Sequence, residues 1–410
     1  MKRAELQSRL LILVTLALVA FGLVMVYSAT SAAAELGGKD PTYYLKRQGM
    51  YAALGIVLMM LAQRWDYRRL RHVAPMLILV SIVLLVAVLG IGEDVNGARR
   101  WIGFGPAVFQ PSELAKLAVA IWAASYFSKR SAPQTLKELW RPAGALAAIF
   151  SVLLILEPDM GTAIILLAVL AAVLLVAGTP TRVLGAALAI AGTLGTLAIW
   201  IEPYRRARFF SFLHPTQDPQ GVGYQTMQGL ISMGSGGITG VGIGNGIGKI
   251  FYLPEAANDM MFANIGEELG LIGAAAVIGA YALFTYAGLS VALACRDPFG
   301  KRLAAGITAL VACQAAINVA AVMAVAPLTG IPLPFLSYGG SSLIVLLAGV
   351  GILLNIAQRG SAAAASVSDR SRRDGRARAA RARGRGSADG ARRARDVRRV
   401  AGSRRSASGS

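Results

Sequence analysis

The sequence has little charge, almost no histidine and only two cysteines. Charged residues make up 15% of its 410 residues and hydrophobic ones 55%, a balance that excludes an ordinary soluble domain of this length. Cys295 and Cys313 fall in or beside apolar segments, which argues against a disulfide framework and against a thiolate metal site. His72 and His214 have no partner pattern. The composition therefore indicates a protein with many membrane spans.

Acidic residues are also scarce, 21 against 41 basic ones, which leaves a net charge of +20. Much of this excess lies after Gly360, where fifteen arginines stand against four aspartates. This stretch has almost no large apolar side chain and cannot bury a core, so we expect residues 360–410 to be a disordered cytoplasmic tail. Arg-rich segments bind anionic membranes, nucleic acid or acidic partners. Because the tail follows a span, we favour the membrane surface or a partner protein over nucleic acid.

Apolar runs predict about ten membrane spans, each near the roughly 20 residues that a bilayer core needs. The first run has a basic start but is long enough to span and lacks a convincing cleavage site, so we do not expect a cleavable signal peptide. The expected fold is an all-α polytopic membrane protein, with residues 1–359 as one membrane domain. The fourth run is short and carries charge. The spans are roughly 9–29, 48–64, 73–91, 112–127, 142–157, 160–178, 183–201, 263–293, 303–326 and 341–357.

Basic residues in alternate loops predict the orientation. They gather at the N-terminus and after spans two, four and eight, and ten spans place all of them on one side with the tail. That side is expected to be cytoplasmic, with both termini there. The long loop 202–262, between spans seven and eight, then faces outward. Its glycines between Gly229 and Gly248 fit either a phosphate-binding backbone or a tightly turned loop packed on the membrane surface.

Four carboxylates stand where this long loop enters span eight: Glu255, Asp259, Glu267 and Glu268. Ionisable groups at a membrane boundary are costly to desolvate and mark functional sites. Asp259 is followed by Met-Met-Phe, and an acid beside an apolar wall tends to have the raised pKa that suits a general base. The alternative is an N-cap for the helix of span eight, since Asp and Asn favour that position.

Two further pairs of charges lie near the outer side. Glu113 and Lys116 are three residues apart at the start of span four, so they share a helix face that points into the bundle or forms a structural ion pair. Arg99 and Arg100 lie in an outer loop, where the positive-inside rule gives no reason for them. Anion binding is one explanation for these arginines, and interfacial anchoring beside Trp101 is the other.

Glu157 and Asp159 flank a proline in the tight turn between spans five and six, where Asp159 can also cap the next helix. Gln314 and Asn318, four residues apart in span nine, favour joining helices over binding substrate. The charges in or beside the spans thus gather at the outer ends of spans four, five, six and eight. Such an arrangement predicts one polar site that opens outward and takes a lipid-linked anionic substrate.

Six motifs in this order resemble the SEDS proteins (shape, elongation, division and sporulation) of the FtsW/RodA type. The resemblance covers roughly residues 9–359, and the ten spans agree with that family's fold. The Gly266-Glu-Glu-Leu-Gly270 form and Asn258 look closer to FtsW than to RodA. The motifs are Asn96-Gly-Ala-Arg-Arg-Trp-Ile102, Gln110-Pro-Ser-Glu-Leu-Ala-Lys-Leu117, Glu157-Pro-Asp-Met-Gly-Thr162, Asp218 to Gln228, Tyr252 to Gly270, and Thr329-Gly-Ile-Pro-Leu-Pro-Phe-Leu-Ser-Tyr-Gly-Gly-Ser-Ser342.

The resemblance implies a peptidoglycan glycosyltransferase that polymerises lipid II on the outer face of the bacterial cytoplasmic membrane, at the division septum if the FtsW likeness holds. Asp259 matches the family's essential acid, and Glu113 and Lys116 match its charged pair. A class B penicillin-binding protein, the transpeptidase, and other division proteins are the implied partners. In place of the Ser and Gln that many members carry, Gly246-Ile-Gly248 precedes Lys249 here.

The expected chemistry is inverting glycosyl transfer with Asp259 as the base. Basic side chains, with Lys116, Arg99 and Arg100 as candidates, or a divalent cation such as Mg or Mn would stabilise the departing pyrophosphate. We expect no organic cofactor. A lipid II flippase, a RodA-type elongation polymerase and a non-catalytic scaffold are the alternatives. The remaining candidates for substrate binding are Glu157, Asp159, Lys249, Glu255 and Glu268.

Overall fold

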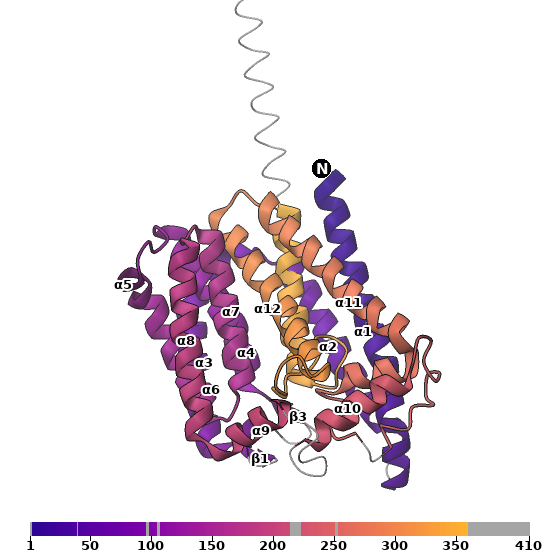
Figure 1. Cartoon of the computed structure of the whole chain (residues 1–410). Coiled ribbons are helices and arrows are strands. Elements are labelled where there is room, and N and C mark those ends of the chain that lie inside the picture. Colours follow the sequence, from indigo (N-terminus) through magenta and orange to yellow (C-terminus); the bar gives the residue numbers. More distant parts are fainter. Residues whose placement is uncertain are drawn as a thin grey trace, which may run out of the picture. The chain divides into compact units, whose positions relative to one another are not determined.

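Helices form at each of the ten predicted spans (Figure 1). The computed structural model describes residues 2–38, 40–95, 98–104, 107–213, 223–250 and 253–359. The predicted tail 360–410 lies outside the described residues, as do parts of three quoted motifs: residues 96–97, 218–222 and Tyr252. The long helices are α1 (Lys2–Leu36), α2 (Tyr43–Arg64), α3 (Leu70–Ile91), α4 (Pro111–Lys129), α6 (Ala145–Leu156), α7 (Met160–Ala177), α8 (Thr181–Ile201), α11 (Met261–Ala294), α12 (Pro298–Val322) and a last helix, Gly340–Arg359.

Eight candidate spans among the described residues are long and apolar enough to cross a membrane, and α2 and α4 are not among them. For α4 the reason lies in its position. It packs against α3, α7 and α12, and most of its side chains are buried inside the bundle, including the charged Glu113 and Lys116. A helix that is enclosed by other helices need not present an apolar surface to lipid. Its mean hydropathy can therefore be lower than that of a helix that faces lipid.

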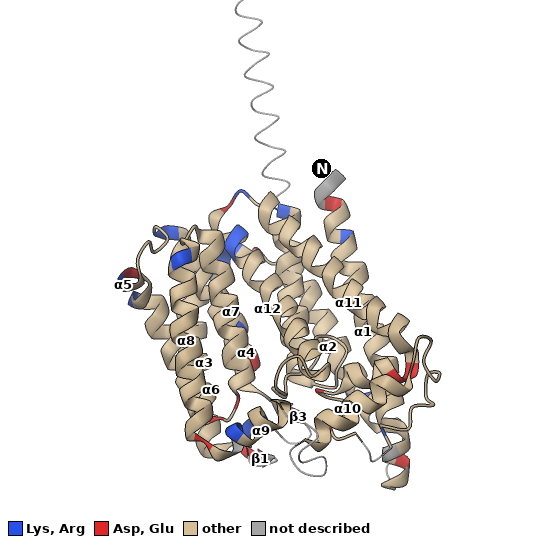
Figure 2. Cartoon of the chain, viewed as in Figure 1, with Lys and Arg blue, Asp and Glu red and all other residues tan. Residues whose placement is uncertain are grey.

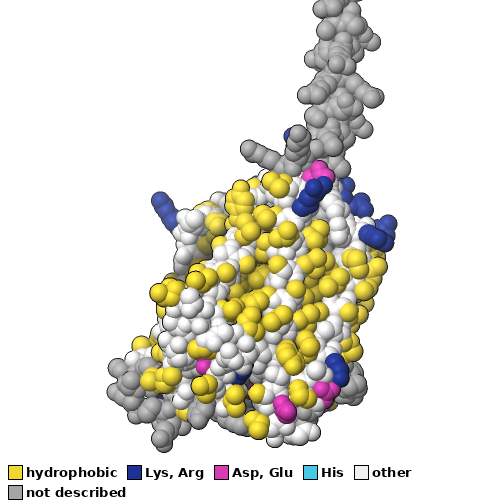
Figure 3. Space-filling model, turned by 90° about the vertical axis from the view of Figure 1, so that its right-hand side faces the viewer, with side chains coloured by type: hydrophobic (Ala, Val, Ile, Leu, Met, Phe, Trp, Pro, Cys, Tyr) yellow, Lys and Arg dark blue, Asp and Glu magenta, His cyan; other side chains and the backbone are white. Residues whose placement is uncertain are grey.

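The core is formed by α4, α7, α11 and α12, with α1 against α11 (Figure 1). In contrast, α8 lies at the edge, and among its residues only Leu184 is buried. Two short segments, α5 (Leu136–Leu139) and the π-helical turn Trp140–Gly144, precede α6. Figure 3 shows hydrophobic side chains over the middle of one side, between charged side chains at both ends. That distribution fits a protein whose middle faces lipid.

The loop 92–111 contains a small sheet that the sequence analysis did not predict. Its strands are β1 (Glu93–Val95), β2 (Ala98–Phe104) and β3 (Ala107–Phe109), antiparallel in the order β1-β2-β3. Along β2 the side chains of Ala98 and Ile102 are buried and that of Arg99 is exposed. The sheet packs on α3 and α4, which fixes the two arginines of β2 at one end of the bundle.

The long loop before α11 also has structure of its own. It contains two helices, α9 (Pro203–Leu213) and α10 (Tyr224–Ser235), and α10 packs along the start of α11. Helix α11 changes direction at Gly270, whose φ of 64° is open to glycine at little cost. Opposite this kink, Gly240 also has a positive φ, and a Cβ there would collide with the carbonyl oxygen of Glu268. The glycines therefore let the loop lie directly on the first turns of α11.

The two ends of the bundle differ in charge (Figure 2). We call the end that holds the start of α1 and the end of the last helix the basic end, because mostly Lys and Arg lie there, Arg64 and Arg359 among them. Helices α9 and α10 and the strands β1 and β3 lie at the opposite end (Figure 1). Asp259 contacts Gln225 of α10, and β2 pairs with both strands, so they lie there too, and we call this end the Asp259 end. This segregation follows the pattern of alternate basic loops that the sequence analysis used to predict orientation.

Candidate functional site

Asp259 lies in the turn that runs from Leu253 to Met260 and enters α11. Its carboxylate is half-buried, and its side-chain hydrogen bonds are long ones from Gln225 of α10, whose Nε2 is 3.4 Å from each oxygen. Burial, reinforced by nearby Glu255, raises the pKa of Asp259 to about 7, while Arg208 and Gln225 act in the opposite direction. An acid with this pKa exchanges a proton readily at neutral pH.

The N-cap alternative for Asp259 is wrong. The N-cap of α11 is Met260, and no side chain caps that helix. The Asp259 carboxylate therefore does not cap the helix, and its oxygens remain available for chemistry.

The backbone around Asp259 is held by α12 and by the segment that joins α12 to the last helix. Asn318 Nδ2 donates to the carbonyl oxygens of both Asp259 and Ile331, each at 2.8 Å. The Ser337 hydroxyl donates to the carbonyl of Asn258, and the Tyr338 amide donates to the carbonyl of Ala257 at 2.8 Å. Three successive carbonyls of the turn are thus bound from one side, so the position of the Asp259 carboxylate is fixed through its backbone.

A second charged cluster is buried within the bundle. Lys116 Nζ lies 2.8 Å from Glu113 Oε1 and donates to Gln314 Oε1 at 3.1 Å, and both charged side chains are at most 2% exposed. Gln314 in turn donates to the carbonyl of Pro332 at 3.0 Å. Gln314 and Asn318 therefore connect the charged pair and the Asp259 turn to one segment, residues 331–338. As predicted, Gln314 joins two helices, α12 and α4.

A third cluster lies where the glycine-rich loop meets α11. Glu268 is fully buried and accepts from Lys249 Nζ at 2.5 Å and from Ser28 Oγ at 2.6 Å. The amide of Gly244 also donates to Glu268, and the amides of Ile247 and Gly248 donate to Glu267. These loop amides are occupied by carboxylates of the same chain, so the tightly turned loop, and not the phosphate-binding backbone, is the interpretation that this geometry matches.

The remaining candidates lie near the turn between α6 and α7. Arg100 donates through Nε to the Glu157 carbonyl at 3.0 Å and through its guanidinium to the Pro158 carbonyl. Asp159 caps α7 by accepting from the Thr162 amide at 3.1 Å. The Glu157 carboxylate is buried, and neither oxygen has a hydrogen-bond partner among the described residues. Burial, with a contribution from Asp159, raises its pKa to about 8.

Arg99 differs from its neighbour Arg100. Its side chain is exposed, and its Nε lies 4.0 Å from an oxygen of Asp94, a distance at which an exposed pair contributes little. Lys116, Lys249 and Arg100 are engaged in internal contacts, whereas Arg99 is open to a ligand. Among the described residues, no group of three or more histidines, cysteines, aspartates or glutamates is placed to hold a metal ion.

The sequence analysis did not place Arg208, Gln225 or Ser337 beside the Asp259 turn, and it interpreted Asn318, which donates to the Asp259 carbonyl, only as a residue that joins helices. One of them carried a signal. Arg208 belongs to a run of three arginines, with Arg205 and Arg206, in the outer loop. The argument that selected Arg99 and Arg100, basic residues on the wrong side for the positive-inside rule, applies equally there. The others become neighbours only through the fold.

The bundle of membrane-crossing helices defines an integral membrane protein. A half-buried acid with a raised pKa lies at one end of this bundle, and it marks a charged site there. The family model described as "Cell cycle protein", which covers FtsW, RodA and SpoVE, matches residues 8–362. The chain therefore belongs to the FtsW/RodA/SpoVE family of membrane proteins.

Curated relatives cover nearly the whole membrane domain. The "Probable peptidoglycan glycosyltransferase FtsW" of Geobacter metallireducens is 41% identical, over 88% of this chain and 96% of the relative. "Stage V sporulation protein E" of Bacillus subtilis is 38% identical, over 85% and 96%. A solved chain from "Structural coordination of polymerization and crosslinking by a peptidoglycan synthase complex" has a TM-score of 0.72 at 31% identity, covering 85% of this chain and 97% of that one. The Thermus thermophilus rod shape determining protein RodA has a TM-score of 0.62 at 30% identity, with 85% and 95% covered.

Proposed function

We propose that this protein is a peptidoglycan glycosyltransferase that polymerises lipid II into glycan strands, with Asp259 as the general base. The observation that carries the proposal is the Asp259 turn. Its backbone is bound at three successive carbonyls, while the carboxylate has only long hydrogen bonds and a pKa raised to about 7. A base must be positioned firmly and yet keep a proton-accepting oxygen available. The names of the relatives support the same activity.

In the proposed reaction, the hydroxyl oxygen of the acceptor sugar attacks the anomeric carbon of the donor, and its proton passes to Asp259. The bond between that carbon and the pyrophosphate oxygen breaks, and the lipid pyrophosphate leaves with the electron pair. The new glycosidic bond has inverted configuration, because a single displacement occurs. Removal of one proton by a positioned side chain typically contributes about 10²–10⁴-fold to a rate.

Positive charge near the leaving pyrophosphate is the second requirement of this reaction. Arg99 is exposed on β2, and Arg208 of α9 acts electrostatically on Asp259. We propose these two arginines for the phosphates, and we propose that Arg100, Lys116 and Lys249 support the site from within. If a Mg or Mn ion takes part, Glu255 is the nearby carboxylate that could hold it together with the substrate phosphates, and it would supply further positive charge to the leaving group.

The alternative of a lipid II flippase requires polar groups along the whole length of the bundle. The buried charged side chains among the described residues are Glu113, Lys116, Glu157, Asp159, Lys249, Glu267 and Glu268. All seven lie toward the Asp259 end: on the first turns of α4 and α11, in the turn between α6 and α7, and in the glycine-rich loop. A translocation path for a charged head group would need them further along. This distribution therefore favours an enzyme that works at one membrane surface.

We propose that the Asp259 end faces outward and that both termini are cytoplasmic, as the basic loops predict. A class B penicillin-binding protein, other division proteins and membrane lipid are the proposed partners. One structural relative belongs to a study of a peptidoglycan synthase complex that coordinates polymerisation and crosslinking, which supports a transpeptidase partner. The relatives named FtsW support a role in division, at the septum, over elongation.

The test is polymerisation of labelled lipid II by the purified full-length protein, with and without its class B transpeptidase, in proteoliposomes. We expect glycan strands of many disaccharide units. A parallel assay follows movement of fluorescent lipid II between leaflets. Movement without strand formation by a correctly inserted complex would overturn the enzymatic proposal and leave the flippase.

A further inference from the structure

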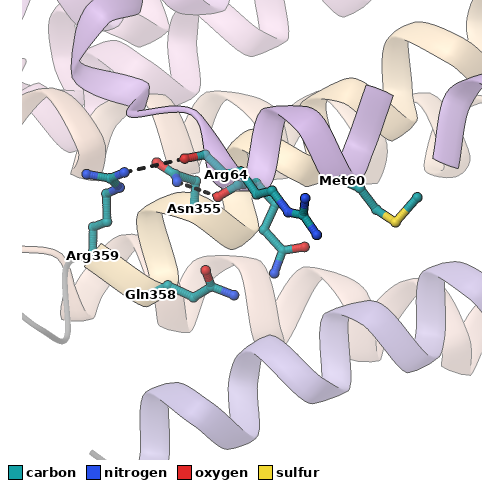
Figure 4. Close-up of a pocket in the computed structure, with 6 residues that line it drawn as sticks. Met60, Arg64, Asn355, Gln358 and Arg359 are labelled. Carbon is teal, nitrogen blue, oxygen red and sulfur yellow. Dashed lines mark hydrogen bonds between the residues drawn. The ribbon is translucent and has the colours of Figure 1, made fainter. Parts of the chain in front are cut away.

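A pocket opens at the basic end of the bundle, whereas Asp259 lies at the other end. It lies between the end of α2 and the end of the last helix (Figure 4). No step of the proposed reaction uses it. Its volume is about 390 Å³, and its lining residues are Met60, Gln63, Arg64, Asn355, Gln358 and Arg359.

The lining combines two guanidinium groups and three amides with no carboxylate. Arg359 is anchored, because its Nη1 lies 3.0 Å from Asp66 Oδ2 and its Nη2 donates to the Arg64 carbonyl at 3.4 Å. Arg64 is different. Its side chain is exposed, and its guanidinium makes no hydrogen bond or ion pair that we find among the described residues. The pocket therefore presents one fixed and one available cation to an anion.

The walls of this pocket are held in place by Asn355, which is buried. Its Nδ2 donates to the Gln63 carbonyl at 2.5 Å, and its Oδ1 accepts from the Tyr67 amide at 3.0 Å. Asn355 thus joins the last helix to the end of α2 and to the short helix η1 (Tyr67–Arg69). The two arginines project around it from different helices (Figure 4). A site whose walls are already joined loses little freedom when a ligand binds.

An apolar row on α2 leads to this pocket. Met50, Leu54, Val57 and Leu61 are 46% to 56% exposed and follow one another at intervals of four, three and four residues. That spacing places them on one face of the helix. Arg64 comes three residues after Leu61, so it continues the same face. A row of exposed apolar side chains that ends at a cation matches a phospholipid, in which acyl chains are joined to a phosphate.

We propose that this pocket binds the headgroup of an anionic phospholipid, whose acyl chains lie along the exposed row of α2. Guanidinium groups recognise phosphate oxygens in a bidentate manner. Basic pockets between membrane helices bind anionic headgroups in this way. A soluble phosphate would use the same two arginines but would gain nothing from the apolar row, which is why the row decides in favour of a lipid.

The test compares two charge-removing variants of the full-length protein, Arg64→Gln in the pocket and Arg69→Gln in η1, which is exposed at the same end but outside the lining. Short-chain phosphatidylglycerol is titrated into the purified protein, and bound lipid is counted by native mass spectrometry. Because both variants keep the Arg-rich tail and have equal net charge, tail binding cancels from the comparison. We expect Arg64→Gln to weaken apparent affinity about fivefold, from the loss of roughly one basic contact, and Arg69→Gln to match the wild type.

Four controls keep the proposal open to contradiction. Arg64→Glu should weaken binding more than Arg64→Gln does. Phosphatidylcholine should not reproduce the effect, and inorganic phosphate should not compete. The melting temperature in phosphatidylcholine checks that each variant is folded. If Arg64→Gln binds phosphatidylglycerol as tightly as Arg69→Gln, or if inorganic phosphate competes fully, the pocket is not a lipid headgroup site.

Discussion

Two carboxylates in the same stretch of chain, Asp259 and Glu268, have opposite surroundings. Glu268 is fully buried, and it accepts from Lys249, from Ser28 and from the amide of Gly244. Asp259 is half-buried and receives only long hydrogen bonds from Gln225. They are nine residues apart, so the difference does not come from membrane depth or local composition alone.

The difference is one of compensation. Both acids lose water, but Glu268 gains a lysine and several donors in return, as a buried charge requires. Asp259 gains little, so its charged form is disfavoured and its pKa rises. A buried carboxylate that has few donors or cations around it takes up a proton more readily. Of these two acids on the same stretch of chain, the one with fewer partners is therefore the better candidate for chemistry, and the one with more partners is structural.

The largest effect is expected for Asp259→Asn. Removing the proposed base should lower polymerisation by about 10²–10⁴-fold. Stability at neutral pH should be equal to or above that of the wild type, because the carboxylate has few partners to lose and Asn removes a poorly compensated charge. The measurement is lipid II polymerisation by the purified variant with its transpeptidase partner, beside a melting curve in the same detergent. Near-normal polymerisation would remove Asp259 from the mechanism.

For Lys249→Met we expect the opposite pattern, in which the direct loss is in stability and not in the chemistry of polymerisation. The variant leaves Glu268 buried beside Ser28 without its cation, and breaking a buried pair in this way costs about 3–5 kcal/mol. Melting should therefore fall strongly. The matched variant Lys249→Met/Glu268→Gln removes both charges and should recover much of the stability and also the polymerisation activity. If Lys249→Met melts like the wild type but loses activity, Lys249 belongs with the substrate and its pairing with Glu268 is incidental.

The raised pKa of Asp259 predicts opposite pH effects on activity and stability. A base must be ionised to accept a proton, so polymerisation should fall about tenfold per pH unit below a pH near 7. The contribution to stability has the other sign. Because the folded-state pKa lies above the ordinary value of 3.8, the protonated acid favours the folded protein, and this contribution is lost as pH rises from about 4 through about 7. Rate and melting profiles of the wild type test both signs. An activity profile flat between pH 5 and 8 would contradict the assignment.

Asn318→Ala should have a smaller effect. It frees the Asp259 and Ile331 carbonyls, and an unsatisfied buried group costs about 1–3 kcal/mol. Asn355→Ala is the matched control, because Asn355 is equally buried and also bonds to backbone groups, but at the basic end. Both variants should lose stability, and only Asn318→Ala should also lower the turnover of lipid II. Equal losses of turnover would show that Asn318 acts through general stability and does not position the base.

The sequence was sufficient for features that repeat along the chain. Apolar runs located ten helices, and the position of Asp259 before the run Leu271–Val291 marked the membrane boundary. It was not sufficient for contacts between distant segments. Asn318 is 59 residues from Asp259, Ser337 is 79 residues from Asn258, and Ser28 is 240 residues from Glu268. No period or spacing encodes such pairs. The sheet in loop 92–111 was missed because its strands are only three to seven residues long.

The smallest effect is expected for removal of the tail after Gly360. The last described helix ends at Arg359, which pairs with Asp66 at the basic end, whereas Asp259 lies at the other end of the bundle. The point at which the tail joins the membrane domain is therefore separated from the proposed chemistry by the length of the helices. Its fifteen arginines are suited to an anionic surface, each adding on the order of 1 kcal/mol near the membrane. Truncation should therefore leave lipid II polymerisation intact in vitro, with its transpeptidase present, and change only localisation or partner recruitment in cells. The measurement is the polymerisation rate of the truncated, correctly inserted protein beside the full-length one, with fluorescence microscopy of both in dividing cells. A truncated protein that inserts but no longer polymerises would mean that the tail acts on the enzyme across the bilayer, and the separation of the two ends would lose its functional meaning.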